Sequence, residues 1–425
     1  MLSRFKVRLT RIGFDFVSLV AVLAFSVARA QDTLSFSEAL RLGEKNSLRI
    51  EAQRAALAAS DALTARAGEL PDPKLQLGIE NLPADGSDRF RIGTDFMTMR
   101  KIGLMQEFPN GEKRRLRGER AARERDLEAA GLAAQRVGVR RDIALAWFDL
   151  YFARKSRDAI AELVRDFELQ LDTLSAAVSS GKQTSADAIA LRGMLENARD
   201  RLIEQDRTIA RAQYVLAVWL RDSAALPLDS PPDTAKLDHA PQVLIGDMKT
   251  HPELRVLDQR EALAETDVSL AVNSKRPDWS VQLSYAQRGP EFSNMVSVMV
   301  SVDLPWEAAK RQDRDIAAKR LIADQVRAQA EDARRMHEAE LFSMYADWQT
   351  ASKRTERFNA LLLPLANDRV QAVLAAYRGG RGELAAVLDA RRAATETRLA
   401  AVQVESERAR AWAKLNFLLP HGDQP

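Results

Sequence analysis

The sequence predicts an α+β membrane protein made of two internal repeats, and three features support this fold class. First, residues 296–304 alternate apolar and mostly polar side chains, as a two-faced β-strand does. Nine extended residues span about 30 Å, which matches the hydrocarbon core of a bilayer. Second, long stretches carry the apolar spacing of coiled-coil helices. Third, both features recur in the second half of the chain in the same order. A half-buried strand of a soluble sheet alternates in the same way, so the other two features decide the class.

Residues 1–30 have the pattern of an export signal. Four basic residues precede an apolar run from Phe16 to Val27, and Ala28-Arg29-Ala30 offers a small-x-small cleavage site, so we expect cleavage after Ala30. This segment holds five of the 63 basic residues and one of the 60 acidic residues. The remaining chain is therefore close to neutral, which argues against a nucleic-acid partner.

The chain contains no cysteine. This composition excludes disulfides, thiolate metal sites, a cysteine nucleophile and an N-terminal cysteine that carries a lipid. Beyond the signal, the sequence has no apolar run of about 18 residues that could form a transmembrane helix. We therefore expect an exported chain that enters a membrane only through strands closed into a barrel.

The first repeat is expected to span residues 31–221. Ser37 is predicted to cap a helix that continues to about Ala67, and the prolines of residues 70–73 stop it. A strand of period two follows around residues 74–80, and a second strand is expected between Phe90 and Phe108. The two strands should form a hairpin.

A helix without proline is predicted from Gly111 to about Val178. Six of its apolar residues follow the four-three spacing of a coiled-coil seam: Ile160, Val164, Phe167, Leu171, Leu174 and Val178. At about 1.5 Å per residue the helix would be near 100 Å long. Residues 179–184 break it, a returning helix is expected over 185–221, and the proline-rich residues 222–250 form a connector.

The second repeat, residues 251–420, follows the same plan and leaves residues 421–425 as a tail. A helix over 251–274 is expected to precede strands at 279–286 and 296–304, then a long helix to about Tyr377, a glycine-rich break over 378–382 and a returning helix. A shift of 199 residues places the first seam on Asn359, Leu363, Ala366, Val370, Val373 and Tyr377, and it places Gly181 on Gly380. A shared period, register and break indicate an internal duplication.

Four strands per chain are too few to close a barrel, and open strand edges in lipid leave unpaired backbone groups that cost several kcal/mol each. The barrel must therefore be shared between chains. Two protomers would supply eight strands with a filled interior, whereas three would supply twelve strands and room for a channel. The helices must also bury their narrow apolar seams against neighbours. Both requirements are met by a long tube.

Several motifs resemble those of TolC-type outer-membrane efflux factors over essentially the whole chain after the signal. They are the paired halves, the strand hairpins, and Tyr377-x-x-Gly380 followed by Val387-Leu388-Asp389-Ala390. Residues 95–109, running into Lys113-Arg-Arg-Leu-Arg117, look most like the heavy-metal cation branch of CzcC and CusC type.

This resemblance implies a homotrimer with a twelve-stranded barrel in the outer membrane and a twelve-helix tunnel through the periplasm. It also implies docking on a periplasmic adaptor protein and on an inner-membrane pump of the resistance-nodulation-division type. Members of the family are passive exit ducts. Many relatives of the metal branch carry a lipidated cysteine, which this chain lacks, so the barrel alone would anchor it in outer-membrane lipid.

The two helix breaks are the expected periplasmic tips. By resemblance, the adaptor contacts are Ser180, Gly181, Lys182, Gly380, Arg381 and Glu383. Ordinary helix-hairpin turns, in which glycine supplies a positive φ, are the alternative.

Three residues near the tips are candidates for the entrance of the tunnel. Asp187 and Asp389 match acids that line the closed entrance in the family, and three protomers would turn them into carboxylate rings that attract cations. A solvated helix face is the alternative for each. Tyr377 matches a tyrosine whose hydroxyl holds neighbouring hairpins together, although it also completes an apolar seam.

No enzyme, metal site or cofactor site is expected. Met97, Met99 and Met105 share one parity and could suggest soft-metal contacts, but structural roles are favoured. The four histidines have no metal-ligand spacing, and no phosphate loop, nucleophile elbow or paired-carboxylate motif stands out. Two other functions remain open: the same duct for drugs, small organic compounds or a secreted polypeptide, and a soluble periplasmic coiled-coil scaffold without a pore.

Overall fold

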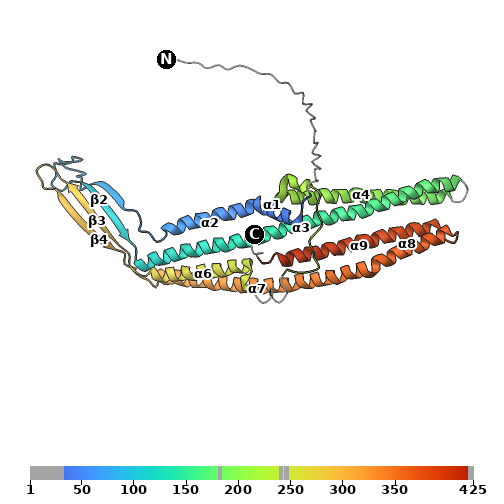
Figure 1. The fold of residues 1–425 in the computed structure, drawn as a ribbon. Helices are drawn as coiled ribbons and strands as arrows, with labels where there is room; N and C mark the ends of the chain where they lie inside the picture. The colour runs from blue at the N-terminus through green and yellow to red at the C-terminus, as the bar shows by residue number, and fades with distance from the viewer. Residues whose placement is uncertain (1–32, 180–183, 239–242, 244–247, 420–425) are drawn as a thin grey trace, which may run out of the picture.

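The computed structural model describes residues 33–179, 184–238, 243 and 248–419. The molecule is elongated, with a β-sheet at one end and two helical hairpins that reach the other end (Figure 1). In the described part of the chain, no helix is both long enough and apolar enough to cross a membrane.

The described part of the first half begins with two helices and a pair of strands, and a long helical hairpin follows. They are α1 (Phe36–Lys45), α2 (Leu48–Arg66), β1 (Lys74–Glu80), β2 (Met99–Phe108), α3 (Gly111–Ser179) and α4 (Ser185–Leu220). A 3-10 turn, η1 (Arg221–Ala225), follows α4, and another, η2 (Met248–Thr250), ends the connector. The strand hairpin and the long helical hairpin α3–α4 agree with the sequence prediction.

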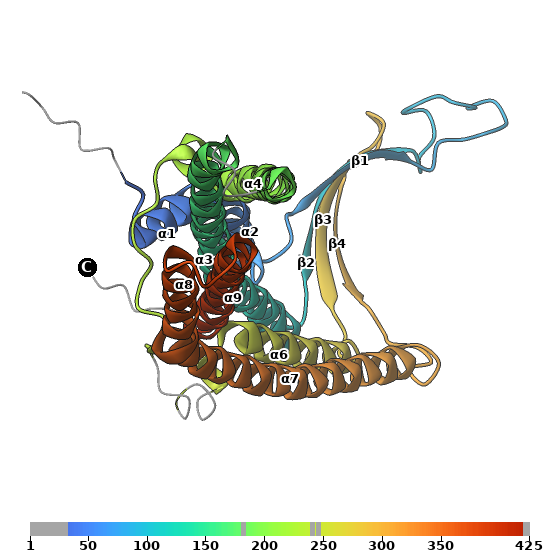
Figure 2. The same ribbon diagram turned by 90° about the vertical axis from the view of Figure 1, so that its right-hand side faces the viewer.

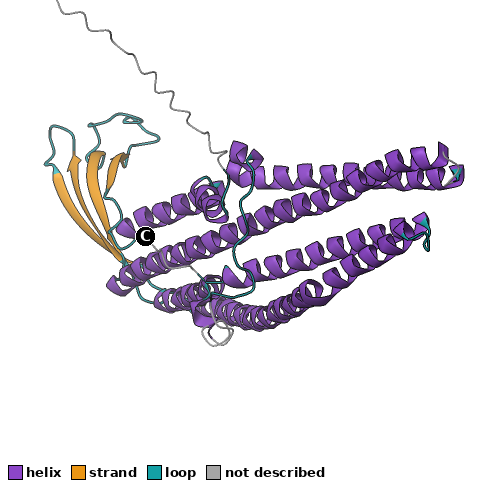
Figure 3. Ribbon diagram, turned by 45° about the vertical axis from the view of Figure 1, so that its right-hand side comes forward, coloured by secondary structure: helices purple, strands orange, loops and turns teal. Residues whose placement is uncertain are grey.

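The second half repeats this order. It contains α6 (Pro252–Asn273), β3 (Trp279–Gln287), β4 (Met295–Val302), α7 (Gln312–Arg357), the π-helical turn η3 (Phe358–Leu362), α8 (Leu363–Arg378) and α9 (Leu384–Asn416). In Figure 3 the two helical hairpins lie side by side and extend away from the sheet.

Two helices predicted as continuous are interrupted. The first begins at Phe36, two residues earlier than a Ser37 cap would allow, because Ser35 is the cap: its side chain accepts a hydrogen bond from the Glu38 N–H at 3.2 Å. It ends at Lys45, and Ser47 caps α2 in the same way. In the second half, η3 separates α7 from α8 just before Pro364. Proline has no N–H and its ring clashes with the preceding turn, which explains the local change in helix type.

The predicted second strand is shorter than expected. Strand β2 begins at Met99, while residues 90–98 form turns in which Phe90 has a positive φ of 57°. Met97 therefore lies before the strand, and only Met99 and Met105 share a strand face.

The four strands form one antiparallel sheet in the order β1-β2-β3-β4. Its register places Leu75, Leu104, Leu283 and Val298 in one row across the sheet, next to the row Leu77, Ile102, Tyr285 and Val296. The other face carries polar and small side chains, for example the row Gln76, Gly103, Ser284 and Ser297. The alternation predicted along the strands thus gives the whole sheet one apolar and one polar face. The sheet is curved and open at β1 and β4 (Figure 2).

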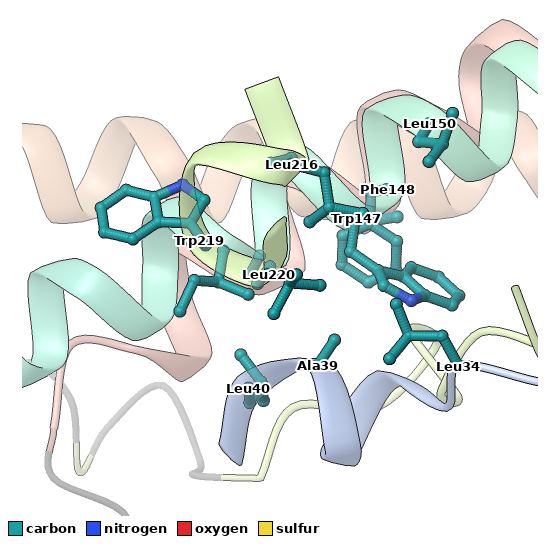
Figure 4. Close-up of a cluster of buried hydrophobic side chains, with 14 of the residues drawn as sticks. Leu34, Ala39, Leu40, Trp147, Phe148, Leu150, Leu216, Trp219 and Leu220 are labelled. Carbon is teal, nitrogen blue, oxygen red and sulfur yellow. The ribbon is translucent and has the colours of Figure 1, made fainter. Parts of the chain in front are cut away.

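The main core lies in the middle of the molecule, where α1, α3, α4 and α9 meet (Figure 4). Trp147 and Phe148 of α3 are fully buried there, and Phe36 of α1 packs on both rings at centroid distances of 5.4 and 5.2 Å. Trp412 of α9 adds a further edge-on ring contact to Phe148. These large rings join the N-terminal helix to both repeats.

Candidate functional site

The ends of α3 and α8 and the starts of α4 and α9 lie together at one end of the molecule, and we call this region the helical tip (Figure 3). A second buried cluster holds the region together. It combines Leu163, Val164, Phe167 and Leu174 of α3, Leu191, Leu195 and Ala198 of α4, and Leu384 and Leu388 of α9. The four α3 residues include three positions of the predicted seam, so the seam packs the two hairpins against each other.

Asp187 forms part of a cap at the start of α4. Thr184 is the N-cap residue, and its hydroxyl accepts a hydrogen bond from the Asp187 N–H at 3.3 Å. In return, the Asp187 carboxylate accepts hydrogen bonds from the Thr184 hydroxyl at 2.7 Å and from the Thr184 N–H at 3.1 Å. The side-chain hydrogen bond, followed by the backbone one, lowers the pKa of Asp187 below its ordinary value. The Asp187 side chain is therefore ionised and stabilises the first turn of α4 as part of its N-terminal cap.

Gly380 supplies the backbone conformation that ends α8. Its φ is +72°, in the left-handed region that favours glycine. The Arg381 N–H donates to the carbonyl of Ala376 at 2.9 Å, and the Gly380 N–H donates to that of Tyr377 at 3.0 Å. This pattern is a Schellman motif. A turn role for Gly380 is thus confirmed, and its role in adaptor docking stays a prediction.

The remaining charged candidates at this turn are exposed. Glu383 occupies the N-cap position of α9 without making a side-chain cap hydrogen bond, and Arg381 precedes it. Asp389 follows the buried Leu388, but its own side chain is 55% exposed and lies 3.7 Å from Arg392. These side chains are accessible to a partner or to a passing cation.

Tyr377 is half-buried and packs against the cluster of the helical tip. The packing role that the sequence offered for this residue is therefore present within one chain. A role of its hydroxyl between hairpins of neighbouring protomers stays a prediction. Ser180, Gly181 and Lys182 lie outside the described residues.

Ion pairs between α3 and α9 were missed by the sequence analysis. Asp166 pairs with Arg391 at 2.5 Å, Glu162 with Arg398, Lys155 with Glu405, and Asp149 with Arg410. The partners are more than 200 residues apart, so only the packing of the second hairpin on the first brings them together. The four pairs form a ladder along the two antiparallel helices, and we call it the α3–α9 ladder.

The described residues contain no group of three or more histidine, cysteine, aspartate or glutamate side chains arranged to hold a metal ion. The predicted site residues accordingly offer charge, turns and packing. The methionines Met105 and Met299 lie on the polar face of the sheet in the row that also holds Lys74 and Gln282.

Comparison with known proteins gives structural matches. No protein-family model and no curated protein sequence matches the chain. The solved structure of CusC, whose crystal structures concern folding and transmembrane channel formation, has a TM-score of 0.77 at 15% identity over 91% of this chain and 92% of that one. The outer-membrane channel OprN has a TM-score of 0.77 at 18% identity, over 92% of this chain and 91% of the OprN chain. The outer-membrane protein VceC from Vibrio cholerae has a TM-score of 0.73 at 16% identity, over 90% of this chain and 94% of the VceC chain. The chain therefore has the fold of these outer-membrane channel proteins along nearly its whole length.

Proposed function

We propose that the chain is one protomer of a trimeric outer-membrane exit duct of the TolC type, with a helical tunnel in the periplasm. The single observation that carries the proposal is the four-stranded sheet, which is open at both edges and exposes one apolar face. Three such sheets joined edge to edge would close a barrel of twelve strands. The common fold with OprN and CusC supports this assignment.

The sheet is poorly suited to water in the isolated chain. All residues of β1 and β4 are exposed, and in the apolar row Leu75, Leu104, Leu283 and Val298 are 53–67% exposed. The two edges also leave backbone groups unpaired, which lipid would penalise by several kcal/mol each. Pairing β4 of one protomer with β1 of the next would satisfy the edges, and lipid would cover the apolar face.

The long helices support the same assembly. Large apolar side chains are exposed on α4, including Ile189, Ile203 and Val218, and on α7, including Leu321 and Met336. Exposed apolar side chains of this kind do not stabilise an isolated helical hairpin, and they are typical of surfaces that contact another chain. Head-to-tail contacts between different faces close into a ring when the rotation is right, as in a three-fold assembly.

The proposed partners are a periplasmic adaptor protein at the helical tip and an inner-membrane pump of the resistance-nodulation-division type. In this proposal the tip residues Ser180, Gly181, Lys182, Gly380, Arg381 and Glu383 contact the adaptor. Asp187 and Asp389 from three protomers form carboxylate rings at the entrance, and Tyr377 helps to hold it closed. The duct is passive, and the pump supplies the energy.

The proposed cargo is a heavy-metal cation. Carboxylate rings would concentrate cations at the entrance. The resemblance of residues 95–117 to the metal branch points the same way.

The membrane assignment is tested with a matched pair of substitutions on β4. Val298→Arg places a charge on the apolar face and should cost about 2–4 kcal/mol if that residue meets lipid near the bilayer centre. Ser297→Arg places the same charge on the opposite face and should be tolerated. The measurement is the amount of protein in the outer-membrane fraction and in trimers. Equal recovery of both variants, or wild-type protein in the periplasmic extract, would instead support a soluble scaffold.

The cargo is tested in a strain that lacks the gene. Wild-type protein, but not a variant with the tip cross-linked shut, should restore growth on copper, silver, zinc or cadmium salts. Restored resistance only to organic compounds would make those compounds the cargo and would leave the proposed duct function unchanged.

The proposed carboxylate rings are tested separately. The double variant Asp187→Asn with Asp389→Asn should lower cation selectivity in planar bilayers, and unchanged selectivity would contradict the rings.

A further inference from the structure

Two histidines that are 86 residues apart in sequence form a buried pair between α6 and α7. His251 is the N-cap residue of α6, and His337 lies within α7. His251 Nδ1 and His337 Nε2 are 2.8 Å apart, and the rings meet edge to face. Only 1% of His251 and 8% of His337 is exposed. The proposed function assigns no role to this contact.

Charged groups from three helices surround the pair. Glu253 of α6 has one carboxylate oxygen 3.8 Å from His337 Nδ1, and its other oxygen is 3.4 Å from Arg141 of α3. Arg334, one turn before His337 on α7, pairs with Asp258 and Glu261 of α6 at 2.8 and 3.4 Å. The positive Arg334 and the negative Glu253 thus flank the histidines along the contact between α6 and α7.

The hydrogen bond restricts how many protons the pair can carry. One facing nitrogen must donate a hydrogen and the other must present a lone pair, whichever tautomers the rings adopt. A pair with one neutral ring and one imidazolium satisfies this condition. When both rings are imidazolium, both facing nitrogens carry hydrogen, and two like charges meet at 2.8 Å in a buried place.

The helix position adds to this restriction. His251 sits at the N-terminus of α6, where the helix dipole disfavours a positive charge. The open arrangement, with both rings free to become imidazolium, therefore binds more protons than the closed one. Proton linkage then favours opening as the pH falls, and the closed contact is stable at neutral pH.

We propose that His251 and His337 form an acid-sensitive latch that holds the start of α6 on α7 at neutral pH and releases it in acid. The released segment would be η2 and the first turn of α6. Its backbone is tied to the latch residue itself, because the N–H groups of Leu254 and Arg255 each donate to the carbonyl of His251 at 3.0 Å, and the His251 N–H donates to Met248 at 3.1 Å. Release would loosen the middle of the molecule while leaving the sheet and the helical tip in place.

The latch is tested by hydrogen exchange on the full chain purified in detergent, at about pH 7.5 and about pH 5, which bracket the ordinary titration of imidazole. The probe variant is His337→Gln, because its amide oxygen accepts a hydrogen bond from His251 in either charge state. At the same pH, the ratio of wild-type to variant exchange cancels the intrinsic pH dependence of the chemistry. We expect this ratio at the amides of Leu254 and Arg255 to rise by up to about tenfold per pH unit once the second proton enters.

Arg334→Gln is the matched control, since it removes ion pairs between the same two helices without changing a histidine. It should keep the wild-type acid response. If His337→Gln does not fold, His251→Gln serves as the probe in its place, because it too leaves one titrating ring. An acid response that persists in the glutamine probe, that is missing from wild-type protein, or that Arg334→Gln abolishes would overturn the latch.

Discussion

At the scale of single residues, Asp187 has a local role in the structure and a separate role in the proposed assembly. The Asp187 carboxylate closes a reciprocal cap with Thr184, and the same charge is proposed for the entrance ring. The two roles separate by substitution. Thr184→Ala removes the cap but keeps the charge, whereas Asp187→Asn removes the charge and weakens the cap.

We expect both substitutions to speed hydrogen exchange in the first turn of α4, because both disturb the cap. Only Asp187→Asn should lower cation selectivity in planar bilayers. Loss of selectivity in Thr184→Ala as well would mean that loosening of the tip, and not the carboxylate, sets the selectivity.

The cap also has a predictable pH dependence. Hydrogen bonds to Thr184 lower the pKa of Asp187 in the folded chain, so the cap contributes its full stability above the unfolded pKa near 4 and loses it as the pH falls through the lower folded value. Exchange in the first turn of α4 should therefore be insensitive to pH between about 7 and 5, after correction for intrinsic rates, and should rise below about pH 4. Loosening of α4 already at pH 5 would contradict this assignment.

Gly380 is the residue whose conformation sets the turn between α8 and α9. Gly380→Ala should destabilise the hairpin by about 1 kcal/mol, because an L-residue is strained at a φ of +72°. Gly118→Ala is the matched control: this glycine lies inside α3 with open space around it, so alanine should stabilise the helix by about 0.5–1 kcal/mol. The midpoints of thermal unfolding should move in opposite directions. An unchanged or raised midpoint for Gly380→Ala would show that the backbone does not require glycine at position 380.

At the scale of helices, the α3–α9 ladder ties the first hairpin to the second. Its charged side chains are partly exposed, so each pair should contribute about 0.2–1 kcal/mol. Separating the hairpins would require breaking all of them, whereas bending one helix would not.

A charge exchange tests the pair nearest the helical tip. Asp166→Arg alone should destabilise the contact by placing two arginines together, and Asp166→Arg with Arg391→Asp should restore it. The measurement is the coupling energy from a double-mutant cycle of thermal or denaturant unfolding. Additive effects of the two substitutions would mean that the ion pair does not join the hairpins.

At the scale of the whole molecule, the open sheet predicts contacts between copies. Because the natural chain has no cysteine, any disulfide that forms must join two introduced cysteines. A series of double variants combining cysteine at Gly78 of β1 with cysteine at Ser297 or Ser301 of β4 should yield disulfide-linked species that end at the trimer. Pairs that combine Gly103 of β2 with Ser297 should not, because β3 lies between these strands. Only monomers in every variant, or products larger than trimers, would contradict the proposed assembly.

Local patterns were sufficient for most of the elements. Alternation predicted the strands around Leu75 and Val298, and heptad spacing predicted the packing of Phe167 and Leu174, because both signals depend on neighbours a few residues away. Local patterns did not decide which of Ser35 and Ser37 caps the first helix. They also did not predict the π-helical turn that precedes Pro364. The cap at Asp187 follows a recognisable Thr-x-x-Asp spacing, which resembles a capping box and could have been identified in advance.

By itself, the sequence determined the kind of elements, their repetition and the two-faced character of the strands, because periodicity along the chain is a local property. Only the tertiary structure decided which distant side chains meet. The α3–α9 ladder joins residues more than 200 positions apart, and the buried contact of His251 with His337 exists only because α6 packs on α7. Such contacts depend on how helices dock on one another, and docking is set by the sum of many weak packing contacts that no single stretch of sequence contains.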